Sequence, residues 1–103
     1  MKIEIINIKD YEDTNYIYIG RPDKYGNPFS SKDSNIATNV QSKEESLNLF
    51  REHLNQNPDL IDDLIKDLKD NKVSKLGCWC FPKKCHGDIY IEKIKERKFK
   101  SIL

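Results

Sequence analysis

The residues best suited to chemistry lie in one short segment, Cys78–Asp88, which holds all three cysteines and one of the two histidines. A strand is expected to end in this segment, and a helix to begin soon after it. A thiol at a helix N-terminus and beside two lysines has a lowered pKa, and an adjacent imidazole can carry a proton at neutral pH. If the chain is an enzyme, we expect Cys85 as the nucleophile, His86 as the proton carrier and Asp88 as helix cap or orienting group. Group transfer or hydrolysis at a glycosidic or phosphoryl centre would suit this set.

The same segment also permits a metal site. Three thiolates and one imidazole form a known zinc ligand set, and the ligands would be Cys78, Cys80, Cys85 and His86. The spacing is unusual, because two adjacent residues would have to reach one ion. A third interpretation makes Cys78 and Cys80 small buried apolar groups and Trp79 a core or pocket aromatic residue. The sequence leaves these alternatives open.

A second segment, Gly20–Phe29, predicts a shaped loop after a strand, because glycines and prolines fix its turns. Arg21 follows the strand directly and can hold a carboxylate or phosphate with two parallel hydrogen bonds. Asn27 can bind a polar ligand edge or hold the turn, and Tyr25 and Phe29 can stack on a base or ring. Neither G-x-G-x-x-G nor a Walker A motif is present. The ligand-binding candidates are Gly20, Arg21, Pro22, Gly26, Asn27 and Pro28 here, with Gly87 from the other segment.

The elements that must position these two segments are predicted from apolar spacing. Strands are expected over Lys2–Ile8, Tyr16–Ile19 and Val73–Phe81, where residues alternate or form β-branched runs. Between the second and third strands, residues 21–39 read as a long loop.

Helix signals fill the rest of the chain. Ser42 and Glu45 form a capping box, and Asn57 is the expected cap of a second helix that begins at Pro58 and stops near Asn71. A last helix is expected after Asp88, although its first apolar residues could form a strand instead. The order β-β-α-α-β-α predicts a single Rossmann-like α/β domain over residues 1–103, built as a two-layer or three-layer sandwich.

Composition limits the function classes. The formal net charge is +1, so no strong field draws the chain to nucleic acid or to an anionic membrane. The longest apolar run is far shorter than the ~20 residues of a membrane span, and the polar first residues do not resemble a signal peptide. We therefore expect a cytoplasmic protein, with a homodimer as one way to cover a sheet edge.

The two segments together resemble the family catalogued as domain of unknown function 4326, which is common in bacteria and phages. The matching pieces are Ile19–Pro22, Gly26–Phe29, Cys78–Cys80 and Cys85–Asp88. The resemblance implies a small α/β fold in which both segments meet at one site. It implies no particular activity.

The leading expectation is a domain that binds a nucleotide-like or phosphate-bearing small molecule. Arg21 would bind the anion, Asn27 would orient the ligand, and the turn at Cys85–Asp88 would supply N–H donors. One alternative is a non-catalytic phage or mobile-element protein that sequesters a nucleotide signal or blocks a host partner. Another is an interaction module held together by zinc, the one cofactor the residues suggest.

Overall fold

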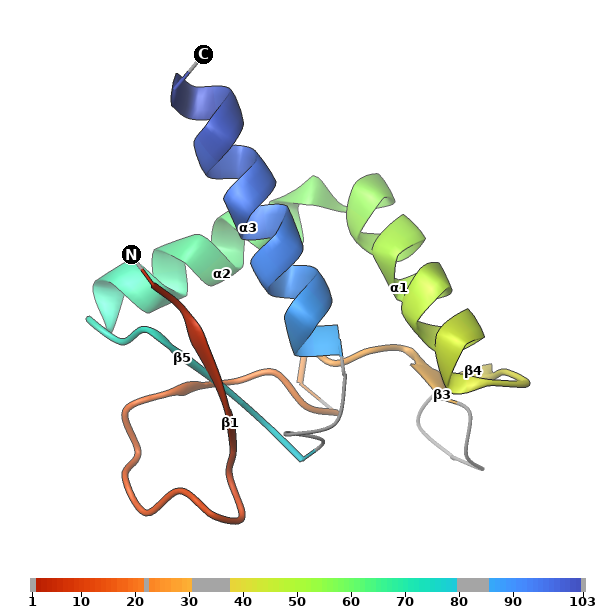
Figure 1. Cartoon of the computed structure of the whole chain (residues 1–103), viewed down its shortest axis with the longest axis horizontal. Helices are drawn as coiled ribbons and strands as arrows, with labels where there is room; N and C mark the ends of the chain where they lie inside the picture. Colours follow the sequence, from red (N-terminus) through yellow and green to blue (C-terminus); the bar gives the residue numbers. More distant parts are fainter. Residues whose placement is uncertain (1, 22, 31–37, 80–85, 103) are drawn as a thin grey trace.

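A three-stranded parallel sheet lies at the base of the fold (Figure 1). The computed structural model describes residues 2–21, 23–30, 38–79 and 86–102. The strand order is β1-β5-β2, with β1 at Glu4–Asn7, β5 at Lys75–Cys78 and β2 at Ile17–Tyr18. All three predicted strands are confirmed, each shorter than the sequence pattern suggested. Because the strands are parallel, their carboxyl ends share one edge of the sheet.

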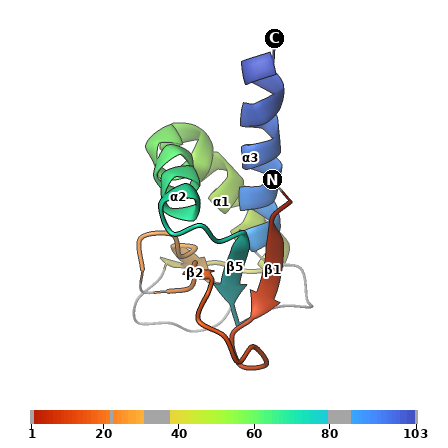
Figure 2. The same ribbon diagram turned by 90° about the vertical axis from the view of Figure 1, so that its left-hand side faces the viewer.

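Two helices, α2 (Pro58–Asp70) and α3 (His86–Ile102), lie over one face of this sheet, which makes the fold the two-layer form of the predicted sandwich (Figure 2). The helix α1 (Lys43–Gln56) packs on both of them and extends beyond the carboxyl end of the strands (Figure 1). Leu76 of β5 faces them and is fully buried. Buried residues of the helices make up most of the core: Phe50, Leu54, Ile61, Leu64, Leu68, Ile89, Tyr90 and Ile94.

The loop after β1 lies against the other face of the sheet. Gly77 points to this side, where an added Cβ would lie 2.5 Å from the ring of Tyr16 and 2.7 Å from Ile8. Tyr11 packs edge-to-face on Tyr16. The sheet is therefore covered on both faces, by helices on one and by aromatic loop residues on the other.

The helix boundaries confirm most of the sequence signals and correct two. The backbone N–H of Glu45 donates to the Ser42 hydroxyl at 3.0 Å, as the capping box predicts. Asn57 takes the N-cap position of α2, as predicted, but its side chain does not cap that helix and donates instead to the His53 carbonyl of α1 at 2.8 Å. The last helix begins at His86, three residues before the predicted start at Ile89, so Asp88 lies in its first turn and is not its cap.

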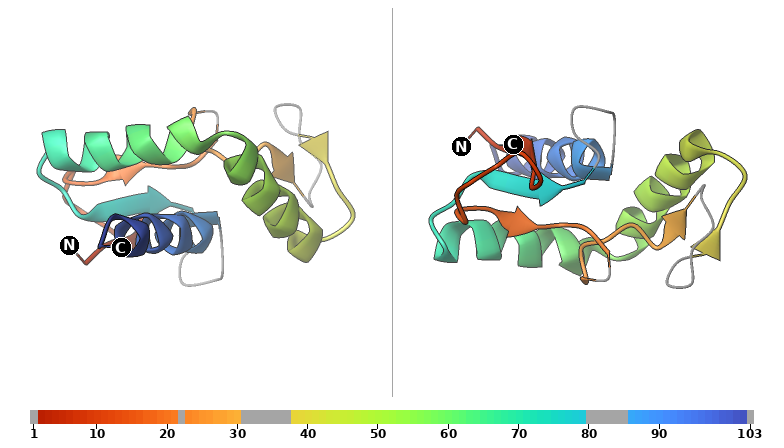
Figure 3. Two further views of the ribbon diagram at one scale, coloured as in Figure 1. Left: turned by 90° about the horizontal axis from the view of Figure 1, so that it is seen from above. Right: turned by 90° about the horizontal axis from the view of Figure 1, so that it is seen from below.

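A second, small sheet lies inside the segment predicted as a long loop. Its strands are β3 (Phe29–Ser30) and β4 (Thr38–Asn39), paired in parallel. Figure 3 shows this sheet beside the start of α1, at the opposite end of the molecule from α2. In the described part of the chain, no helix is long and apolar enough to cross a lipid bilayer.

Candidate functional site

The start of α3 lies against the end of β2, which brings the two predicted segments together. Nε2 of His86, the first residue of α3, lies 2.5 Å from the backbone carbonyl oxygen of Ile19, just after β2. Trp79 follows β5, the strand next to β2. The described parts of both segments thus meet at the carboxyl edge of the parallel sheet, the place where open α/β sheets bind ligands.

His86 is buried as a neutral imidazole. Burial lowers its pKa most, and the positive charge of Arg21 lowers it further, against the opposing effects of the Ile19 carbonyl and Asp88. A carbonyl oxygen can only accept, so Nε2 of His86 must carry the proton. In the neutral ring, Nδ1 is then the nitrogen that can accept a proton or a hydrogen bond. Phe50 packs edge-on against this ring at 5.4 Å between centroids, which holds its orientation.

Arg21 brings a positive charge near His86. Its Nη1 is shielded from solvent and has no hydrogen-bond partner within the described residues. Its backbone carbonyl accepts a hydrogen bond from the Tyr18 hydroxyl at 2.9 Å. Gly26 packs so closely that an added Cβ would lie 3.0 Å from the Cα and Cγ of Arg21. The residue as a whole is half-buried, so Nη1 is a buried donor atom without a partner in a side chain that also reaches solvent, which is uncommon in folded proteins.

Asn27 holds the loop in shape. Its side-chain oxygen accepts from the Phe29 N–H at 2.9 Å, and its amide donates to the buried Ser46 hydroxyl of α1 at 2.8 Å. That hydroxyl donates in turn to the Phe29 carbonyl at 2.7 Å. Of the two roles that the sequence allowed, the structure shows the turn-holding one. The ligand-orienting role stays a prediction. The hydrogen bond to Ser46 uses one amide hydrogen of Asn27 and leaves the other for a ligand.

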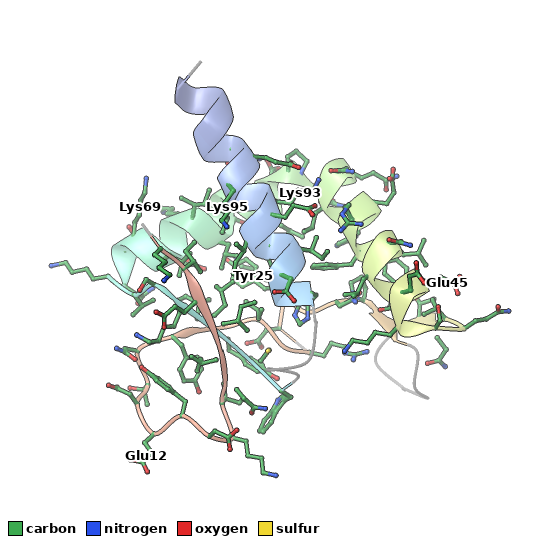
Figure 4. The ribbon with its side chains drawn as sticks, in the orientation of Figure 1. Glu12, Tyr25, Glu45, Lys69, Lys93 and Lys95 are labelled. Carbon is green, nitrogen blue, oxygen red and sulfur yellow. The ribbon has the colours of Figure 1, made fainter. Side chains whose placement is uncertain are left out.

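Tyr25 belongs to the core, so the prediction that it stacks on a ligand is wrong. It is only 3% exposed, and its hydroxyl donates to Asp67 of α2 at 2.5 Å. Tyr90 donates to the Tyr25 carbonyl at 2.8 Å. Burial, followed by the hydrogen bond to Asp67, raises the pKa of Tyr25. Figure 4 shows its side chain near the start of α3, in contrast to the peripheral Glu12.

Among the residues that the structure describes, Trp79 is the large aromatic residue exposed at this edge. It is 61% exposed, so its interpretation as a core aromatic is wrong. The alternation along β5 could have predicted that Trp79 lies outside the core. Leu76 and Cys78 point into the core, and successive strand residues point to opposite faces. A strand with two inward residues places its neighbours on the other face.

Of the three cysteines, the structure describes Cys78 alone. Cys78 is buried, as expected for a small apolar group, but Cys80 and Cys85 lie outside the described residues, as does Pro22. In the described part, no three metal-binding side chains come together. The nucleophile and the zinc site therefore stay predictions.

The remaining candidate residues differ in their exposure to solvent. Gly20 and Gly87 are buried, Pro28 is half-buried, and Asp88 is exposed in the first turn of α3.

Comparison with known proteins adds the family. A family model described as Domain of unknown function (DUF4326) matches residues 6–96. The chain belongs to this family. Searches of curated proteins and of solved structures gave no match. The match includes every site residue described above, so the edge formed by β2, β5 and α3 is part of the DUF4326 domain.

Proposed function

We propose that this DUF4326 domain binds a small phosphate-bearing molecule of the nucleotide type at the carboxyl edge of its parallel sheet. The observation that carries the proposal is Nη1 of Arg21, which is shielded from solvent and has no partner among the described residues. Buried polar groups are nearly always hydrogen-bonded in folded proteins. A ligand oxygen with negative charge would satisfy this nitrogen, and a guanidinium matches phosphate geometry with two parallel bonds.

The start of α3 supports the same ligand class. The hydrogen bond from His86 to the Ile19 carbonyl holds the N-terminus of α3 against β2. Ile19 precedes Arg21 by two residues in the sequence. The positive end of the helix dipole favours negative charge there. Because His86 is neutral, it leaves Arg21 as the cation of this pair. A phosphate is therefore favoured over a neutral ligand.

The described residues also outline a rival location. A cleft of about 370 Å³ opens between α1 and α3, and Lys43, Asn48 and Arg51 line it. Arg51 is already paired there, since its Nε lies 2.9 Å from a carboxylate oxygen of Glu92. This pairing satisfies the arginine without a ligand. We therefore place the anion at Arg21.

Calorimetric titration with AMP tests the proposal. We expect saturable binding to the wild-type chain, and Arg21→Gln should weaken it by about tenfold or more, because a charge-assisted hydrogen bond contributes ~1.5–3 kcal/mol. Cys85→Ser should leave the affinity unchanged, because binding needs no nucleophile.

Arg97→Gln is the matched control. Arg97 lies about three turns further along α3, where it pairs with Asp62 and donates to the Pro58 carbonyl at 3.0 Å. Its loss should not change AMP affinity. The proposal fails if AMP, ADP and inorganic phosphate all fail to bind at millimolar concentration, or if both arginine variants bind AMP as the wild type does.

A further inference from the structure

Trp79 is a large apolar side chain in an unusual position. It is 61% exposed, and it is the one tryptophan of the chain. Its neighbours in β5 are buried, so the exposure begins where the strand ends and the site begins. Single exposed apolar residues are ordinary on protein surfaces, so what distinguishes Trp79 is how its ring is held at this edge.

The indole ring is fixed rather than free. Its Nε1 donates to the Tyr18 hydroxyl at 3.0 Å, and that hydroxyl donates to the Arg21 carbonyl at 2.9 Å. The Trp79 carbonyl also accepts from the side-chain amide of Asn7 at 3.3 Å. The polar edge of the ring is thus satisfied inside the protein, and the apolar surface faces outward.

Gly20 makes this arrangement possible. An added Cβ there would lie 2.3 Å from the Tyr18 hydroxyl oxygen and 2.5 Å from its ring carbon. Tyr18 therefore lies directly on the Gly20 backbone, where it links Trp79 to Arg21. The Tyr18 hydroxyl connects the exposed ring to the backbone of Arg21, whose Nη1 has no partner among the described residues.

We propose that Trp79 is the stacking surface for the aromatic base of the nucleotide whose phosphate Arg21 binds. This inference rests on the proposed function and narrows it to ligands that carry both a phosphate and an aromatic base. An aromatic ring held in one orientation stacks a base at little cost in side-chain entropy, and such stacking is sequence-tolerant because every base has a π face. The hydrogen bonds through Tyr18 connect this ring to the backbone carbonyl of Arg21, the residue whose guanidinium forms the proposed anion site.

The fluorescence of the single tryptophan tests the inference directly. AMP should quench Trp79 emission with saturation, whereas ribose 5-phosphate, which lacks the base, should bind by calorimetry without quenching. Trp79→Ala should weaken AMP binding by about tenfold, in line with ~1–3 kcal/mol for one stacked base. The same variant should leave the affinity for ribose 5-phosphate unchanged, and Trp79→Phe should restore part of the AMP affinity.

The outcomes separate this inference from the proposed function. If ribose 5-phosphate and AMP bind equally well and Trp79→Ala alters neither, the phosphate site stands and the stacking role is overturned. If adenosine quenches Trp79 and Arg21→Gln does not weaken AMP binding, the stacking surface stands and the phosphate site is overturned. If Trp79→Ala instead abolishes self-association in sedimentation equilibrium and spares AMP binding, the ring belongs to an interface between copies.

Discussion

His86 is the residue whose chemistry the fold changes most. In an unfolded chain, its imidazole would titrate with an ordinary pKa near 6.5. In the folded protein, burial and the charge of Arg21 lower that pKa, while the Ile19 carbonyl requires a proton on Nε2. The ring is therefore kept neutral in a fixed tautomer, which suits a proton acceptor or a spacer better than a cationic anion-binding group.

This lowered pKa predicts acid sensitivity. Below pH ~6.5 the unfolded chain binds a proton at this histidine that the folded chain does not, so stability is full above that pH and falls as the pH decreases towards the folded value. The expected slope in the free energy of unfolding approaches about 1.4 kcal/mol per pH unit. Urea denaturation between pH 7.5 and 5 measures it.

His86→Gln should remove most of this slope, while His53→Gln should retain it. The contribution of His86 is wrongly assigned if the two variants lose stability with acid to the same extent as the wild type. Gln keeps a donor for the Ile19 carbonyl, so the variant separates titration from loss of the hydrogen bond.

Residue types made Arg21 and His86 candidates, because each is a charged or titratable group in a loop after a predicted strand, and the family resemblance implied that their two segments meet. They did not separate Tyr25 from Trp79. Both are aromatic residues in candidate loops, and which of them is buried depends on how α2 and α3 pack over β2 and β5. Asp67, the hydrogen-bond partner of Tyr25, is 42 residues away in the chain. Local sequence carries little information about a contact of that range.

At the scale of elements, the loop after β2 is held by α1. Ser46 is buried and connects the side chain of Asn27 to the carbonyl of Phe29. These two hydrogen bonds of Ser46 hold the segment between Arg21 and β3 in place. The small sheet that follows was missed because strands of two residues show no apolar period.

Ser46→Ala is expected to lower the free energy of unfolding by about 1–3 kcal/mol, because it leaves a buried amide donor without its partner. It should also weaken AMP binding, since the loop that carries Arg21 loses its anchor. Urea denaturation and calorimetry measure the two effects. Ser42→Ala, which removes the exposed cap of the same helix, should cost ~1 kcal/mol and leave AMP binding intact. Equal effects of both variants on binding would contradict the anchoring role.

In the whole molecule, as far as the structure describes it, the two faces of the parallel sheet are covered and its carboxyl edge is not covered by a helix or by the loop after β1. Helices cover one face of the parallel sheet and the loop after β1 covers the other, so its carboxyl edge is left for the two motif segments (Figures 1 and 2). With a net charge of +1, the chain offers no strong global attraction to an anion. The binding that we propose therefore depends on the local arrangement of Arg21 and the start of α3. The fold class followed from periodicity and caps, but the two-layer form did not, because helix order alone does not say which face each helix covers.

The most direct test of the central claim is an amide and indole NMR titration of the 15N-labelled chain with AMP. We expect the largest shift changes at the backbone of Gly20, Arg21 and Gly87 and at the single indole N–H of Trp79. The indole signal should respond to AMP and not to inorganic phosphate, while Arg21 should respond to both. Changes concentrated instead at Lys43, Asn48 and Arg51, in the cleft between α1 and α3, would contradict the site at the carboxyl edge of the sheet.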